Sequence, residues 1–254
     1  MKSFPKFNKA VLQIIAAIAM TVDHLAWFFF PGYPRDALPI LLHVFGRLAF
    51  PIFAFFIAEG YHYTRNKNRY MLRILLFAAL SHVPYMFASN QFPEYGPLCF
   101  VPFATGNGIG RFLNQGSVLF SYFIGLAMLR VNDSPKFKEW QKVIIVLFLC
   151  LFSFPCDWSC IGSLVVLSIG SNRGKPIKQI VWSFVWILLY GLVYALALDW
   201  VYGLIQLGVV LALPLLFLYN GQKSKHPFVN RFMRHFLYLY YPLHLTAIGL
   251  LYLL

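Results

Sequence analysis

Long apolar stretches separated by short polar segments dominate this sequence. They lie near 10–30, 38–61, 70–88, 115–129, 143–155, 158–170, 177–198, 201–219 and 236–254. Most approach the length of about 20 residues that an α-helix needs to cross the hydrocarbon core of a bilayer. The pattern therefore predicts an all-α polytopic membrane protein with about nine transmembrane helices, organised as a single domain over residues 1–254.

Two of these stretches, 143–155 and 158–170, are shorter than the others. A helix of about 13 residues extends roughly 20 Å, which is less than a hydrocarbon core of about 30 Å. The pair therefore either crosses the membrane twice or forms a re-entrant hairpin, which would leave seven crossings. Both alternatives give the rest of the chain the same orientation.

The distribution of positive charge predicts that orientation. If the N-terminus is cytoplasmic, only Arg35 and Arg111 fall in outer segments and Arg47 falls inside an apolar stretch. The other 18 of the 21 cationic residues fall in inner segments: Lys2, Lys6, Lys9, Arg65, Lys67, Arg69, Arg73, Arg130, Lys136, Lys138, Lys142, Arg173, Lys175, Lys178, Lys223, Lys225, Arg231 and Arg234. Cytoplasmic loops of membrane proteins are enriched in Lys and Arg. We therefore expect a multi-pass protein of the inner (cytoplasmic) membrane with its N-terminus inside and its C-terminus outside.

Composition changes this picture little. Charged residues make up 11% of the chain and hydrophobic residues 60%, whereas about a quarter of the residues of a soluble domain are charged. The excess of 21 Lys and Arg over eight Asp and Glu would suggest a nucleic-acid partner in a soluble protein. Here the charge pattern is a topology signal, and we expect no nucleic-acid partner. The four cysteines lack the convergent partners of a metal site, so none is expected.

Several ionisable residues lie within apolar stretches. Asp23 and His24 lie in the first, His43 and Arg47 lie one helical turn apart in the second, and His244 lies in the last. A charge near the middle of a membrane costs at least about 2.5 kcal/mol, so such residues usually face a bundle interior and often act on a substrate. Adjacent residues on a helix diverge by about 100°, so we expect Asp23 and His24 to have different partners.

His24 is the best candidate for chemistry, because imidazole acts as a base near neutral pH or as a nucleophile. A nearby carboxylate such as Asp23 would orient the ring or stabilise its cation. The alternative is structural: Asp23 pairs with Arg47 to join two helices, and His24 only bonds to a neighbour. For His43 and Glu59, a structural role is the favoured interpretation.

Five segments resemble the TraX family. They are IIAAIAMTVDHLAWFFFP (14–31), FGRLAFPIFAFFIAEGYHYTRNKNRYMLRILLFA (45–78), NQGSVLFSYFIGLAML (114–129), CDWSCIGSLVVLSIG (156–170) and YYPLHL (240–245). The family is named for a conjugation protein that acetylates the N-terminal amine of F-type pilin. It is similar to a larger class of transmembrane acyltransferases that use cytoplasmic acetyl-CoA.

The resemblance implies roles for individual residues. It carries over Asp23 and His24 as the first motif, Arg47 and Glu59 as the second, Asp157 as an acidic residue before the sixth stretch, and His244 in the terminal motif. Family members often carry Lys or Arg eleven residues before the histidine, where this chain has Gln13. Lys9, one helical turn away, is the candidate to supply that positive charge in this chain.

The resemblance and the topology together predict an acyltransferase. It would move an acetyl group from cytoplasmic acetyl-CoA to an amine or hydroxyl at the outer side of the membrane, on pilin, another peptide or a small molecule. The expected catalytic residues are Asp23, His24, Arg47, Asp157 and His244. The expected cofactor-binding residues are Glu59 and an inner basic rim formed by Arg65, Lys67, Arg69 and Arg73.

Two other classes of function remain open at this point. In a proton-coupled transporter or channel, the same buried residues would relay protons or bind a solute. In a non-enzymatic assembly factor for a surface structure, they would serve helix packing alone. The sequence does not choose between direct transfer and an acetyl-histidine intermediate, and it fixes neither the acceptor nor the oligomeric state.

Overall fold

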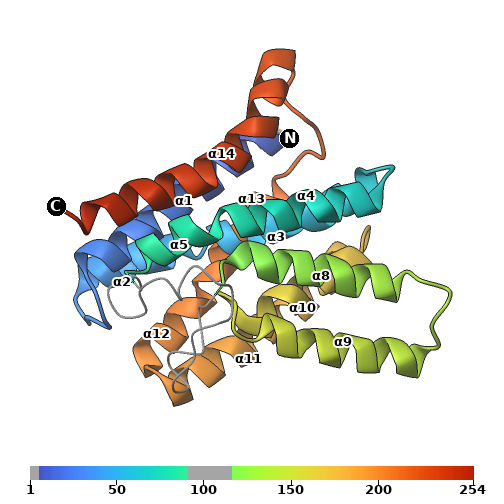
Figure 1. Cartoon of the computed structure of the whole chain (residues 1–254), viewed down its shortest axis with the longest axis horizontal. Helices are drawn as coiled ribbons and strands as arrows, with labels where there is room; N and C mark the ends of the chain where they lie inside the picture. The colour runs from blue at the N-terminus through green and yellow to red at the C-terminus, as the bar shows by residue number, and fades with distance from the viewer. Residues whose placement is uncertain (1–5, 91–115) are drawn as a thin grey trace, which may run out of the picture. The chain divides into compact units, whose positions relative to one another are not determined.

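The computed structural model describes residues 6–90 and 116–254, and these form helices joined by short connections (Figure 1). The helices are α1 (Lys9–Phe29), α2 (Ala37–Gly46), α3 (Ala49–Tyr63), α4 (Lys67–Leu80), α5 (His82–Ala88), α8 (Val118–Asn132), α9 (Glu139–Ser153), α10 (Ser159–Ser171), α11 (Pro176–Ala197), α12 (Trp200–Ile205), the 3-10 helix η2 (Gln206–Leu211), α13 (Ala212–Phe217) and α14 (Pro227–Leu251). Two isolated β-bridges are the only extended pairings in the described ranges. The chain divides into unit 1 (residues 1–53 and 191–244) and unit 2 (residues 54–190 and 245–254).

The expected all-helical architecture is confirmed for the described residues. Within them, four helical segments are long and apolar enough to cross a membrane: Lys9–Phe29, Ala37–Tyr63, Pro176–Ala197 and Trp200–Phe217. The bent pair α4 and α5 makes a fifth if it counts as one span. The shorter apolar helices include α8 and α10. Nine crossings, or seven with a re-entrant pair, therefore stay predictions.

The predicted stretches and the observed helices agree closely except at two places. The last helix begins at Pro227 rather than near 236, because its first turns carry Arg231 and Arg234 and so lack an apolar average. Proline suits this first helical position, where its missing N–H removes no helical hydrogen bond. The outer segment predicted at 89–114, with Arg111, lies outside the described residues from position 91 onward.

In unit 1, α1 and α14 lie side by side and run in the same direction (Figure 1). Thr21 Oγ1 lies 2.6 Å from the Tyr240 hydroxyl, and further along both helices the rings of His24 and His244 meet. At the start of α1, the backbone N–H of Lys9 donates to the Gln222 carbonyl at 3.0 Å.

In unit 2, α8 and α10 approach closely because small residues line their contact. A Cβ at Gly125 would lie 2.8 Å from the Ser163 carbonyl oxygen, so no larger residue fits there. The Ser163 hydroxyl donates to the Ser121 carbonyl at 2.7 Å, and the Ser121 hydroxyl donates to the Asp157 carbonyl at 2.8 Å. Close backbones and interhelical hydrogen bonds are the usual means of packing helices in a bilayer.

The orientation can be tested with terminal reporters. We expect a C-terminal fusion to a reporter that folds only outside the cytoplasm to be active. The opposite orientation would place most of the cationic residues outside the cytoplasm. The same reporter at the N-terminus should be inactive, and a reporter active only in the cytoplasm should give the reverse pattern. Cytoplasmic activity at the C-terminus would refute the predicted sidedness.

Candidate functional site

A partly buried carboxylate on α1, that of Asp23, joins two helices of unit 1. Arg47, in the break between α2 and α3, donates from one guanidinium nitrogen to both Asp23 oxygens, at 2.6 and 2.8 Å. His43 Nδ1 lies 2.9 Å from the same carboxylate. A Cβ at position 46 would lie 2.7 Å from the Asp23 Cγ, so Gly46 permits this approach. The structural alternative, a pair between Asp23 and Arg47, is therefore present.

The remaining donors of Arg47 also have protein partners. A second guanidinium nitrogen donates to Gln206 Oε1 at 3.1 Å, and Nε lies 3.4 Å from the His43 carbonyl. Gln206 in turn donates to the Tyr202 carbonyl at 3.0 Å. The network fixes the guanidinium between α1, α2 and η2, so in this arrangement Arg47 holds Asp23 in place.

His24, the neighbour of Asp23, has a separate partner, as the divergence of adjacent helical residues predicts. Its Nδ1 lies 3.0 Å from His244 Nε2, and His244 Nδ1 lies 2.9 Å from the Tyr240 carbonyl. A carbonyl only accepts hydrogen bonds, so His244 Nδ1 carries its proton. With both rings neutral, His244 Nε2 must accept from His24 Nδ1. This tautomer leaves a lone pair on His24 Nε2, the state required of a base or nucleophile.

His43 is more deeply placed than any other polar residue of this network. Its side chain is fully buried, and the rings of Trp27 and Tyr202 lie 4.5 and 5.4 Å from its own. Its Nε2 has no hydrogen-bond partner among the described residues, while Nδ1 is used by Asp23. A buried nitrogen without a hydrogen bond lowers the stability of a fold by about 1–3 kcal/mol, so the His43 ring is a destabilising element of this network.

A second ion pair holds the start of α12, the helix that leads to Gln206. Asp199 caps α12 by accepting from the backbone N–H groups of Val201 and Tyr202, and it pairs with Arg35 at 3.3 Å. The Tyr202 N–H, and after it the Arg35 guanidinium, lowers the pKa of Asp199 below its ordinary value. The carboxylate therefore stays ionised at neutral pH and keeps the cap.

The predicted basic rim belongs to unit 2. Arg65, Arg69 and Arg73 are exposed, and the last two share a face of α4 because they are four residues apart. Lys67 pairs with Asp133 at 3.4 Å and lies over the Tyr61 ring. The rim thus presents three exposed guanidinium groups at the start of α4.

Two other predicted site residues have roles within unit 2. Glu59 pairs with Arg173 at 3.2 Å, which agrees with the structural interpretation of that residue. Asp157 lies between α9 and α10, where its backbone N–H donates to the Gly116 carbonyl at 2.7 Å. Unit 1 therefore brings together Asp23, His24, Arg47 and His244 but includes neither Glu59 nor Asp157. Residues 6–90 and 116–254 contain no group of three or more acidic, His or Cys side chains suited to a metal ion.

Sequence reasoning missed one residue of the network. Gln206 was not singled out, although it is an isolated polar residue inside the apolar stretch 201–219. It would have been found by asking which polar side chains can bond to Arg47. The bond from His43 to Asp23 agrees with the structural interpretation favoured for His43.

Comparisons with known proteins agree with the resemblance noted in the sequence. The family model described as "TraX protein" matches residues 8–252, which span both units. A protein of Dichelobacter nodosus named "Probable fimbrial assembly protein FimC, serogroup H1" is 27% identical over 251 residues. The match covers 95% of this chain and 94% of that protein. No solved structure matches the chain.

Proposed function

Because this chain belongs to the TraX family, we propose that it is a membrane-embedded acyltransferase that uses acetyl-CoA. It would reside in the cytoplasmic membrane and acetylate an amine or hydroxyl presented at the outer side. The observation that carries the proposal is the chain of bonds from Tyr240 through His244 to His24, which leaves His24 Nε2 with a free lone pair.

In the direct version of the reaction, His24 Nε2 takes the proton from the acceptor as that group attacks the thioester carbonyl. The new bond joins the acceptor nitrogen or oxygen to the acetyl carbon, and the carbon–sulfur bond breaks. The proton then passes from His24 to the departing thiolate, which leaves as CoA thiol. His244 accepts a hydrogen bond from Nδ1 throughout and so keeps Nε2 directed at the reactants.

In the covalent version, His24 Nε2 attacks the thioester carbonyl first, the carbon–sulfur bond breaks, and the CoA thiolate takes a proton from water. The acceptor then attacks the acetyl carbon, the bond from that carbon to Nε2 breaks, and the acceptor gives its proton to water. Both versions place a positive charge on the His24 ring at one stage. The Asp23 carboxylate, on the adjacent residue, favours that charge through space rather than by direct contact, because its oxygens are bonded to Arg47 and His43.

We assign positioning roles to Arg47 and His43. Arg47 was expected to be a catalytic residue, but its three nitrogens bond to Asp23, Gln206 and the His43 carbonyl. Its positive charge allows Asp23 to remain ionised in an apolar bundle, where an unpaired carboxylate would be costly. His43 holds the other side of the same carboxylate.

The acceptor that we favour is the N-terminal amine of a pilin-like subunit. The relative from Dichelobacter nodosus is named as a probable fimbrial assembly protein, and the chain aligns with almost its whole length. Acetylation of a subunit would be a step of such assembly. A non-enzymatic role in assembly is the competing proposal, and it predicts neither binding nor consumption of acetyl-CoA.

Purified protein in detergent tests the proposal. We expect it to release CoA from acetyl-CoA in the presence of a suitable acceptor and to yield an acceptor heavier by one acetyl group. A panel of apolar peptides with free amines, glycans and lipid headgroup analogues should identify the acceptor class by mass spectrometry. Absence of both acetyl-CoA binding and acetyl transfer would favour the non-enzymatic role.

The basic rim of unit 2 gives a separate prediction for the donor. Arg65→Glu with Arg69→Glu should raise the Michaelis constant for acetyl-CoA by roughly tenfold or more, since reversed charges repel the phosphates of CoA. The constant for the acceptor should change little. Lys136→Glu with Lys138→Glu, at another predicted cytoplasmic loop, is the charge-matched control. If the Michaelis constant for acetyl-CoA is unchanged in the folded variant, the positive charge of the rim reflects membrane topology alone.

A further inference from the structure

Two cysteines meet where α9 and α10 join. Cys150 lies in the last turn of α9, and Cys160 is the second residue of α10. Their thiols are hydrogen-bonded to each other. Both residues are partly exposed, whereas Cys156, in the connection between the two helices, is 1% exposed. Cys150 and Cys160 are therefore a pair of adjacent thiols that a reagent can reach.

Hydroxyl contacts hold the two helices together beside this pair. The Oγ atoms of Ser153 and Ser163, each one turn further along its helix, lie 2.5 Å apart. The Ser153 hydroxyl also lies 3.2 Å from the Ser159 carbonyl oxygen. These contacts keep the sulfur atoms close, so only a small movement of the two side chains is needed to reach the S–S distance of about 2 Å.

The thiol pair lies at the end of α9 and α10 that is remote from their basic residues. Lys142 is in the first turn of α9, and Arg173 follows the end of α10. Cys150 is about 12 Å along the helix from Lys142. If the basic ends are cytoplasmic, as the charge pattern predicts, the connection is directed outward. It carries Asp157, which would be costly within a hydrocarbon core.

We propose that Cys150 and Cys160 form a disulfide at the outer side of the membrane. Compartments outside the cytoplasm are oxidising, whereas cytoplasmic thiols are kept reduced. The oxidant is a thiol–disulfide oxidoreductase of the outer compartment, whose own disulfide accepts the electrons. Two crossings by α9 and α10 follow, because the tip of a re-entrant hairpin would lie within the membrane, out of reach of such an enzyme.

Thiol–disulfide exchange balances in two steps. One cysteine loses its proton to water, and its sulfur attacks the disulfide of the oxidant. A mixed disulfide forms, and one sulfur of the oxidant leaves and takes up a proton. The second cysteine then loses its proton and attacks the sulfur of the first, and the other sulfur of the oxidant leaves and is protonated. The cysteine pair loses two electrons and two protons, and the oxidant becomes a dithiol.

A cross-link at this point compensates for the slight burial of α9. The structure describes the whole of α9, and Ser153 alone is buried among its residues. Leu147 and Leu151 are 61% and 68% exposed. Elements with few buried contacts open at low cost in free energy. A disulfide from Cys150 to Cys160 restricts the separation of α9 from α10 and so stabilises this part of unit 2.

Peptide mapping of wild-type protein tests the disulfide. Cells are quenched with acid so that thiols cannot exchange, and free thiols are alkylated before digestion with trypsin. The tryptic peptide 143–173 contains Cys150, Cys156 and Cys160. We expect it to carry one alkyl group, on Cys156, and to be lighter by two hydrogen atoms than the singly alkylated peptide with two thiols. Reduction and a second alkylation should give three alkyl groups.

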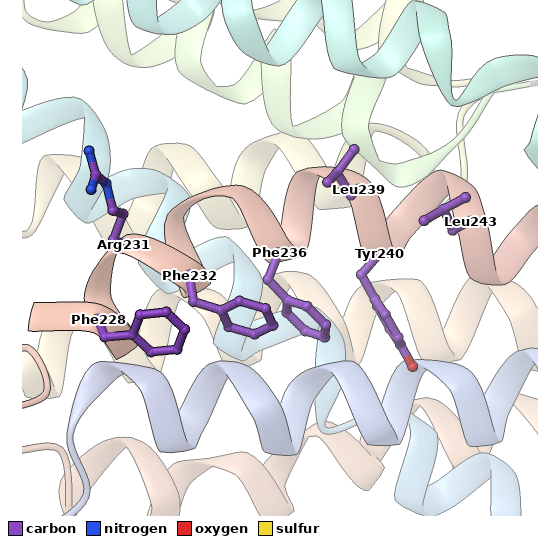
Figure 2. A pocket seen from close by; sticks show the side chains of 7 residues that line it. All are labelled: Phe228, Arg231, Phe232, Phe236, Leu239, Tyr240 and Leu243. Carbon is purple, nitrogen blue, oxygen red and sulfur yellow. The ribbon is translucent and has the colours of Figure 1, made fainter. Parts of the chain in front are cut away.

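Labelling from outside tests the side of the membrane. In intact spheroplasts, an impermeant maleimide should label Cys150 and Cys160 only after treatment with an impermeant reductant. Phe228→Cys is the control, because Phe228 is 78% exposed and lies near Arg231 at the predicted cytoplasmic end of α14 (Figure 2). This cysteine should be labelled in opened membranes and not in intact spheroplasts, with or without reductant.

Thermal unfolding in detergent measures the effect of the cross-link. Cys150→Ser with Cys160→Ser should lower the melting temperature by roughly 5 °C, since closing a short loop stabilises moderately. Reductant should lower the melting temperature of wild-type protein by a similar amount and leave that of the double variant unchanged. Cys156→Ser protein retains the disulfide and should still respond to reductant.

Three results would overturn the inference. Three alkyl groups on peptide 143–173 from wild-type cells would mean that the pair stays reduced. A single alkyl group on Cys150 or Cys160 would mean that Cys156 takes part in a different disulfide. Failure to label the reduced pair in intact spheroplasts would place it away from the outer surface. Each result leaves the proposed function standing, because no step of acetyl transfer uses these thiols.

Discussion

Acetyl transfer should fall by about a hundredfold to ten-thousandfold in His24→Ala protein, the usual cost of removing a general base. A larger loss is expected if the imidazole itself carries the acetyl group, because the covalent intermediate cannot form without His24. The variant should still fold, since His24 is only partly buried and, among the described residues, its side chain bonds to His244. Turnover per folded molecule, with melting temperature on the same sample, measures both expectations.

A matched histidine provides the control for this variant. His62, on α3, bonds to the Gly170 carbonyl at 2.9 Å, and His62→Gln keeps a donor for that bond. It should retain activity. His244→Gln is informative as well, because a glutamine oxygen can accept from His24 Nδ1 and should preserve more activity than His244→Leu. Full activity in His24→Ala protein would refute the mechanism.

Loss of the Asp23 charge should have the largest effect on stability. In Asp23→Asn protein, Arg47 is left partly buried without its carboxylate, and breaking a fully buried pair costs about 3–5 kcal/mol, which is the upper limit here. The side chains of Arg47 and Asp23 are 11% and 16% exposed, so solvent does little to offset the loss. Turnover per folded molecule should fall too, because the cation on His24 loses a neighbouring negative charge. Thermal unfolding in detergent and turnover on one preparation measure the two effects.

The pair of Glu59 and Arg173, whose guanidinium is more exposed than that of Arg47, is the control for this experiment. Arg173 is 40% exposed, and surface ion pairs contribute about 0–1 kcal/mol, so Glu59→Gln should lower the melting temperature only slightly. The double variant Asp23→Asn with Arg47→Gln should recover part of the stability, because no unpaired charge remains, yet should stay impaired in turnover. If Asp23→Asn lowers the melting temperature but leaves turnover unchanged, the pair serves helix packing alone.

The helices of this protein follow from the sequence to a large extent, because each apolar stretch must satisfy its backbone hydrogen bonds internally in a bilayer. The start of α14 was placed too late, since a hydropathy average cannot detect a helix whose first turns carry charge. The number of crossings does not follow from the lengths of the apolar stretches or of the helices. Helices such as α8 and α10 fall between the lengths of spanning and re-entrant segments.

The site was predictable in part for the same reason. A charge inside an apolar stretch needs a partner, and the pair of Asp23 and Arg47 that was the structural alternative is present. The need for a partner could not show that Asp23 would be shared with His43, or that His24 would bond to a ring 220 positions away, because such contacts depend on tertiary packing.

The central claim is that acetyl groups pass from a donor on the cytoplasmic side to an acceptor on the other. Sealed proteoliposomes test it most directly, with acetyl-CoA supplied only at the face bearing the N-terminus and an acceptor peptide only at the opposite face. The account predicts an acceptor heavier by one acetyl group in wild-type vesicles and little or none in vesicles of His24→Ala protein. Unmodified acceptor in wild-type vesicles, with a peptide that is acetylated in detergent by the same preparation, would contradict it.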